Sequence, residues 1–363
     1  MNSILRFIIF HCLIIILLLF VSCDNQNEST MKTVSVDIND LKELSLSNGR
    51  VIKLQSNDSS LIFSISDIVK IKNCLYIQSR DMIKAFRDQD GMYIRDIGVR
   101  GNGPGEHTSI SQIWENNENI CFSDFNTNSA FTYDTNGKCI NTITPLFDTS
   151  DRTHRASHFI VYPDSSCLIA LNTLGNGSTP NPVASVLDLN RRLKNNIKGR
   201  DVLDSGHLSI RMAQDKENNR ILYWEGFKDT IFAITTDSIA PIYAIDFGNT
   251  RYSNQNENDI FKTMRQFDED VKAGARYTSI IQNIQKWKNL IFFVFTTDNN
   301  HFFYLGTINT DNNHVQTYHI DDAQYQQEPF IKILGDYLYI ELSDKTNIEA
   351  NPALFVIGAD IFN

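Results

Sequence analysis

The sequence predicts an all-β protein: a six-bladed β-propeller built from four-stranded antiparallel blades. Three observations favour this fold. Short apolar runs alternate with turn residues along most of the chain, the pattern recurs with a long period, and a spare strand near the N-terminus matches a missing strand in the last unit. Regularly spaced short strands are typical of a sandwich, a barrel or a propeller, and a long repeat favours the propeller.

Turn sequences mark one position of each repeat. Asp88-Gln-Asp-Gly91 and Asp134-Thr-Asn-Gly137 each separate two apolar runs. Asp-Gly and Asn-Gly supply the positive φ angles that a tight hairpin needs. The later units have Asp188–Asn190, Thr236–Ser238 and Asn309–Asp311 at the same place. These turns begin near residues 88, 134, 188, 235 and 309, so they are 46, 54, 47 and 74 residues apart.

Three strands precede each turn and one follows it, so each unit has four strands. Leu75–Gln78, Ile120–Ser123 and Ile221–Trp224 are examples of the second strand. The last unit supplies only three strands, ending with Ala353–Ile357. We expect Val51–Leu54 to be its fourth, outer strand, because a closed ring leaves only short, protected strand edges.

The long interval between the fourth and fifth turns contains a helical pattern. Ile260, Met264, Phe267 and Val271 follow one another at spacings of +4, +3 and +4, and Asp259 can cap the first turn. We therefore expect a small helical insertion near residues 259–274.

The N-terminal residues have the pattern of a signal peptide. Phe7–Val21 is a run of fifteen residues, apolar except for His11, and it follows Arg6. A membrane-spanning helix needs about 20 such residues, whereas a signal-peptide core needs about 7–15. The predicted organisation is a signal peptide over residues 1–22, a polar tether over 23–48 and a propeller over 49–363.

Phe20-Val21-Ser22-Cys23 resembles the lipobox of bacterial lipoproteins, in which Leu usually stands at the place of Phe20. The resemblance implies cleavage before Cys23 and a covalent lipid on that cysteine, which would hold the protein at the outer membrane. Asp24 and Glu28 resemble the acidic export signal of Bacteroidetes surface lipoproteins, which implies surface exposure. The alternative is an ordinary secretory signal followed by a chance cysteine.

Ile97–Glu106 resembles a segment of the six-bladed β-propeller lipoproteins common in Bacteroidetes, which have Gly-x-Gly-Pro-Gly-Glu after the first blade. The matching residues are Gly101, Gly103, Pro104, Gly105 and Glu106. An aromatic residue usually follows the Glu, whereas this chain has His107. No helical pattern follows the glycines and Pro104 lacks an N–H donor, so a tight crossover between blades is favoured over a phosphate-binding loop.

Charge and cysteine content exclude some classes of function. The formal net charge is −10, and it becomes −11 when Arg6 leaves with the signal peptide. An acidic chain without a basic run is a poor partner for nucleic acid. We expect a monomer.

The cysteines of the mature chain, Cys74, Cys121, Cys139 and Cys167, have no CxxC spacing. We therefore expect them to be small buried side chains, and a disulfide bond between two of them is the alternative.

Four residues are candidates for a ligand site at the mouth of the central channel. His107, His154, His207 and Arg276 precede the second strands of blades two to five by 13, 13, 14 and 14 residues. A generic polar ligand site is one interpretation. A zinc site formed by the three histidines is the other. No catalytic residue and no cofactor besides the lipid is assigned.

Two functions follow from these observations. The first is a binding module for a glycan, a peptide or an envelope protein, which needs no catalytic group. The second is a metal-assisted lyase or hydrolase at the channel mouth that uses the three histidines. Propellers serve both purposes, so the fold does not decide between them.

Overall fold

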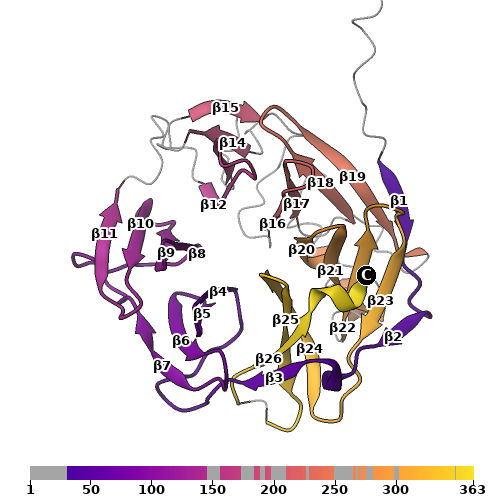
Figure 1. Ribbon diagram of the computed structural model, residues 1–363, viewed down its shortest axis with the longest axis horizontal. Coiled ribbons are helices and arrows are strands. Elements are labelled where there is room, and N and C mark those ends of the chain that lie inside the picture. The colour runs from indigo at the N-terminus through magenta and orange to yellow at the C-terminus, as the bar shows by residue number, and fades with distance from the viewer. Residues whose placement is uncertain are drawn as a thin grey trace, which may run out of the picture.

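The computed structural model describes residues 31–144, 156–172, 184–188, 193–197, 210–225, 229–248, 265–266, 269–270, 272–274, 281–297, 302–347 and 349–363. It confirms the predicted six-bladed β-propeller: six antiparallel four-stranded blades stand in a ring, and two of them carry an additional parallel strand at the outer edge (Figure 1). The first strand of each blade is the innermost, and the first strands of several neighbouring blades contact one another.

The strands of the first three blades follow the chain in order. They are β4 (Asp67–Ile71), β5 (Cys74–Ser79), β6 (Met82–Arg87) and β7 (Tyr93–Ile97) in blade one; β8 (Gln112–Asn116), β9 (Asn119–Asp124), β10 (Ser129–Tyr133) and β11 (Cys139–Ile143) in blade two; β12 (Ala156–Val161), β13 (Leu168–Asn172), β14 (Ala184–Leu187) and β15 (Leu193–Ile197) in blade three.

The last three blades each gain a strand from the N-terminal part of the chain. Their own strands are β16 (Ile210–Asp215), β17 (Arg220–Glu225), β18 (Thr230–Ile234) and β19 (Ile239–Asp246) in blade four; β20 (Ile281–Trp287), β21 (Leu290–Thr297), β22 (Phe302–Asn309) and β23 (Val315–His319) in blade five; β24 (Tyr325–Leu334), β25 (Tyr337–Asp344) and β26 (Ala353–Gly358) in blade six.

The predicted closure of the ring is confirmed. β3 (Arg50–Lys53) pairs antiparallel with β26, so blade six contains strands from both ends of the described chain. Gly91 of blade one packs directly against β3. Its φ is +71°, and a Cβ there would lie 2.1 Å from the Lys53 carbonyl oxygen. We call the contact between blade six and blade one the closure seam.

Residues 31–48, assigned to the tether, belong largely to the ring. β1 (Lys32–Ser35) pairs parallel with β19, and β2 (Leu41–Glu43) pairs parallel with β23. The 3₁₀ helix η1 (Leu46–Asn48) then leads into β3. Val34 and Leu44 are buried, which fixes this strap to blades four and five. Figure 1 shows it passing around the outside of the ring. The tether prediction is therefore wrong for this part of the segment.

The hydrophobic core is divided among the contacts between blades. Each contact encloses its own cluster, for example Ile68 and Leu75 of blade one with Tyr339 and Leu354 of blade six. Side-chain amides join the innermost strands as well. Gln112 of β8 bonds both backbone groups of Phe159 of β12, at 2.8 and 2.9 Å. Because innermost strands of neighbouring blades are not paired as a sheet, such amides satisfy their free backbone groups.

The expected helical insertion is present in the described part of 259–274. Residues 265–266, 269–270 and 272 are helical, and the Ala273 amide donates to the Glu269 carbonyl at 2.9 Å. Ile260, Met264, Phe267 and Val271, which carry the predicted pattern, lie outside the described residues. The last described element is the 3₁₀ helix η3 (Ala359–Phe362), whose Phe362 packs against Phe292 and Tyr318.

Candidate functional site

The glycine-rich loop between blades one and two is closed by its own glutamate. The Glu106 carboxylate accepts a hydrogen bond from the Gly103 amide at 2.7 Å. A Cβ on Gly101 would lie 2.0 Å from the same carboxylate oxygen, and Gly105 has a φ of +77°. The Tyr133 hydroxyl donates to the Gly105 carbonyl. The loop is a tight crossover in which a side-chain carboxylate occupies the place that a bound anion would take.

His107 lies in the core between blades one and two. His107 is only 2% exposed. Its ring packs edge-on against the ring of Phe122, with 5.0 Å between the two ring centroids. Nε2 lies 3.2 Å from the Asp81 carbonyl oxygen. The position predicted for His107, an open loop at the channel mouth, does not fit this burial.

The other predicted ligand residues, His154, His207 and Arg276, lie outside the described residues, and so does Cys23. Within the described part of the chain, no group of three or more His, Cys, Asp or Glu side chains is placed to hold a metal ion. Cys74, Cys121, Cys139 and Cys167 are free thiols; Cys121 and Cys167 are buried as expected, whereas Cys74 and Cys139 are only partly buried. Among the described residues, no helix is long and apolar enough to cross a bilayer.

An open pocket of about 400 Å³ lies at the closure seam. It is on the face that carries the β4–β5 and β24–β25 turns, opposite the glycine-rich crossover. Three separate parts of the chain form it: the start of β3, the end of β4, and the adjoining ends of β25 and β26. We call it the closure pocket. Its lining residues are Asn48, Gly49, Arg50, Lys70, Tyr337, Tyr339, Val356, Ile357 and Gly358.

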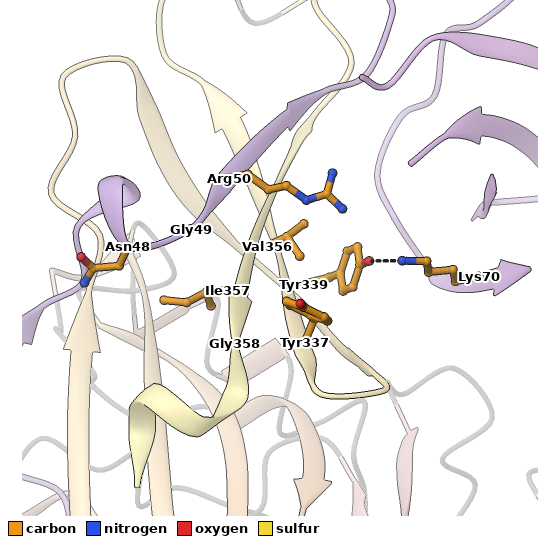
Figure 2. A pocket seen from close by; sticks show the side chains of 9 residues that line it. All are labelled: Asn48, Gly49, Arg50, Lys70, Tyr337, Tyr339, Val356, Ile357 and Gly358. Atoms are coloured by element: carbon orange, nitrogen blue, oxygen red, sulfur yellow. Dashed lines mark hydrogen bonds between the residues drawn. The ribbon is translucent and has the colours of Figure 1, made fainter. Parts of the chain in front are cut away.

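Charged and aromatic side chains converge in the closure pocket (Figure 2). Arg50 donates to the Asp88 carboxylate at 2.7 Å and to the Asp88 carbonyl at 2.6 Å. Lys70 contacts the other Asp88 carboxylate oxygen at 2.7 Å and donates to the Tyr339 hydroxyl at 3.4 Å. One carboxylate therefore holds two cations together across the seam.

This network shifts the titration of its members. Burial alone would raise the pKa of Asp88, but the hydrogen bonds from Lys70 and Arg50 hold that pKa below its ordinary value. Burial and the neighbouring Asp88 carboxylate raise the pKa of Tyr339. Burial opposes the charge on Lys70, yet its bonds to Asp88 and Tyr339 raise its pKa. At neutral pH Asp88 is therefore ionised, Lys70 is charged and Tyr339 is neutral.

One local pattern in the sequence indicates part of this pocket. Tyr337, Tyr339 and Glu341 alternate with Leu338 and Ile340, and alternate residues of a strand share a face. The pattern therefore puts two tyrosines and an acid on one side of β25. Their convergence with Arg50 and Lys70 depends on closure of the ring, which brings together residues more than 250 positions apart, as the 269-residue separation of Lys70 and Tyr339 shows.

Comparison with solved structures shows similarity to other propellers from Bacteroides. A Bacteroides fragilis protein described as exported is 18% identical, with a TM-score of 0.63, over 89% of this chain and 98% of that one. A member of the DUF4221 family from Bacteroides vulgatus is 13% identical, with a TM-score of 0.54, over 84% of this chain and 94% of that one.

No curated protein sequence matches the chain. The family described as a domain of unknown function, DUF4934, matches residues 31–351. That range begins with the strap on blades four and five and continues into blade six, so it covers nearly the whole ring. The chain belongs to the DUF4934 family.

Proposed function

We propose that this chain is a lipid-anchored envelope propeller that binds a glycan, peptide or protein ligand in the closure pocket. The observation that carries the proposal is the convergence of Arg50, Lys70 and Tyr337 at one open pocket. Concave sites of about 300–1,000 Å³ that combine aromatic groups with a few charged ones are typical of small-ligand binding.

The envelope location is supported by the N-terminal sequence. Phe20–Cys23 has the lipobox pattern, and Cys23 is the proposed site of acylation. Each buried CH₂ contributes about 0.8 kcal/mol, and one acyl chain anchors only marginally, whereas two or more chains anchor stably. The fold is shared with a Bacteroides protein described as exported, which supports an envelope or extracellular location.

The alternative of a metal-assisted lyase or hydrolase required His107, His154 and His207 around the channel mouth. His107 is instead packed against Phe122 between two blades, so its ring does not face such a site. In the described residues, no observation favours catalysis over binding.

A thermal-shift screen tests the binding proposal. The full chain, purified in detergent, is screened against oligosaccharides and peptides. The variants are Tyr337→Ala in the pocket and Phe302→Ala as a control, since both aromatic residues are about half exposed, at 53% and 49%. A ligand that binds the folded state raises the melting temperature by mass action.

We expect at least one ligand to raise the melting temperature of the wild type and of Phe302→Ala, and to raise that of Tyr337→Ala much less. A ligand that stabilises all three proteins equally binds elsewhere and would overturn the assignment of the pocket.

A further inference from the structure

We infer that the closure pocket recognises the carboxylate of an acidic saccharide, a uronic acid in a short oligosaccharide. This inference rests on the proposed binding function and names the class of ligand. It is carried by three features of the pocket: which charges face solvent, where an exposed aromatic ring lies, and where a second carboxylate stands beside the lining.

The solvent-facing side of the ion-pair network is cationic. The Asp88 side chain is 12% exposed, whereas those of Arg50 and Lys70 are 43% and 32% exposed. The Asp88 carboxylate is therefore the buried partner, and the two cations face solvent. Arg50 has five N–H donors and Lys70 has three, so both retain donors beyond those used on Asp88 and Tyr339. A ligand carboxylate can accept charge-assisted hydrogen bonds from both.

Tyr337 supplies a flat surface beside these cations. It is 53% exposed and stands two residues before Tyr339 on the same face of β25. An exposed aromatic ring with a polar end suits a partner that is apolar on one face and polar at its edge. A pyranose ring, with C–H groups on its face and hydroxyls around it, has that character.

The far end of the pocket selects against ligands with many negative charges. Asp360 lies beside the lining residue Gly358, because one of its carboxylate oxygens would be 2.5 Å from a Cβ placed there. A carboxylate at this end accepts hydrogen bonds from hydroxyls and repels anions. The pocket thus has two cations in its lining and an acceptor beside its Gly358 end, which matches one carboxylate with several hydroxyls better than a polyacidic peptide or a sulfated glycan.

Matched pairs of oligosaccharides test the inference directly. Isothermal titration calorimetry is performed on the full chain in detergent with short oligomers of galacturonate, glucuronate and mannuronate. Each acid is compared with its methyl ester, which keeps the sugar and removes the charge. Oligomers of a sulfated galactan, which contain no uronate, and an oligoglutamate peptide represent the competing anionic classes.

Three variants locate the site. Lys70→Gln removes one cation, and Tyr337→Ala removes the exposed ring without breaking an interaction that holds the seam. Lys72→Gln is the control: Lys72 lies two residues from Lys70, and its ion pair with Glu118 is exposed on both sides, at 69% and 65%. Circular dichroism confirms that each variant is folded.

We expect at least one uronate oligomer to bind, its methyl ester to bind about tenfold more weakly or worse, and binding to weaken with added salt. Lys70→Gln and Tyr337→Ala should each weaken binding about tenfold, and Lys72→Gln should leave it unchanged.

Each opposite result has a distinct meaning. An acid and its ester that bind equally, with both lost in Tyr337→Ala, would overturn carboxylate recognition and leave the proposed binding function standing. Uronate binding that none of the pocket variants alters would overturn both. Binding of the sulfated oligomers or oligoglutamate alone, or of no anionic saccharide at all, would overturn the uronate class, while the thermal-shift screen judges the binding function separately.

Discussion

Arg50, the first residue of the strand that closes the ring, donates to both the carboxylate and the carbonyl of Asp88 in the first blade, at 2.7 and 2.6 Å. The same carboxylate binds Lys70 of the innermost strand of blade one. A single acid thus connects the outer strand of the last blade to the inner strand of the first. Because Arg50 lies in the strand whose pairing with β26 closes the ring, this network ties the closing strand to blade one.

Replacement of Asp88 should weaken the closure seam. Asp88→Asn keeps the shape of the side chain but leaves Arg50 and Lys70 without their shared counter-charge. Hydrogen bonds to charged groups contribute about 1.5–3 kcal/mol each, so we expect unfolding free energy to fall by about 2 kcal/mol or more. Urea denaturation followed by circular dichroism measures this loss.

The control for this prediction lies in the same turn. Asp90 pairs with Arg87 at 2.7 Å, but both side chains are about half exposed, at 44% and 50%. Exposed ion pairs contribute little, so Asp90→Asn should change stability far less than Asp88→Asn. Because the pKa of Asp88 is lowered in the folded state, its contribution is present above pH about 4 and fades below it. Equal losses in the two variants would contradict the special role of Asp88.

Two neighbouring residues of the strap, Val34 and Thr33, should differ in how well they tolerate a carboxylate. Val34 is 4% exposed and packs on blade four, whereas the adjacent Thr33 is exposed. A carboxylate in place of Val34 must either be buried or detach β1 from β19. We expect Val34→Asp to lower unfolding free energy by about 2 kcal/mol or more and Thr33→Asp to change it little. Limited proteolysis should also cut near residues 31–36 sooner in Val34→Asp. A strap that tolerates both substitutions equally would not be part of the fold.

The strands and the ring were predictable because their signals are local. Asp88–Gly91 and Asp134–Gly137 were placed at turns from their composition, and Gly91 and Gly137 do have φ angles of +71° and +83°. Val51–Leu54 was expected as the closing strand, and β3 spans Arg50–Lys53. Alternation and turn chemistry are sufficient for such elements, since each is determined by a few neighbouring residues.

The strap and the site could not be predicted in the same way. β1 contains a single buried residue, Val34, and a parallel strand added to an outer edge needs backbone pairing more than an apolar pattern. The histidine hypothesis relied on equal spacing, and spacing did not reveal that His107 turns inward against Phe122. The pocket depends on Arg50 meeting Asp88 across the closed ring, which no local pattern describes.

Cys23 carries the prediction for the cell envelope. Cys23→Ser removes the proposed acylation site and leaves the propeller sequence intact. We expect the wild type to partition with membranes and to carry acyl chains on its N-terminal peptide by mass spectrometry, and we expect the variant to lose both properties. Unchanged membrane association in Cys23→Ser would contradict the lipoprotein assignment. Ser22→Thr, which keeps a small hydroxyl residue before the cysteine, serves as a control for the handling of the signal.

Glu341 should make the stability of the ring depend on pH. It is almost fully buried on the face of β25 toward blade one, and it accepts the Ile65 amide at 3.0 Å. Burial, with a smaller effect from the neighbouring Glu328 carboxylate, raises the pKa of Glu341 to about 8. The unfolded chain ionises this group near its ordinary pKa of about 4.3. Between those values the folded state holds a proton that the unfolded state has lost, so stability falls as pH rises.

Glu341→Gln keeps an oxygen for the Ile65 amide and cannot ionise. Its unfolding free energy should equal that of the wild type near pH 4, exceed it increasingly up to pH about 8, and then keep a constant advantage, because both states of the wild type are ionised above that pH. Urea denaturation at pH 4.5, 6.5 and 8.5 measures the difference. Glu118→Gln, at an exposed turn, should give no such pH-dependent gain. Parallel curves for the wild type and Glu341→Gln would show that the Glu341 carboxylate is already ionised in the folded ring.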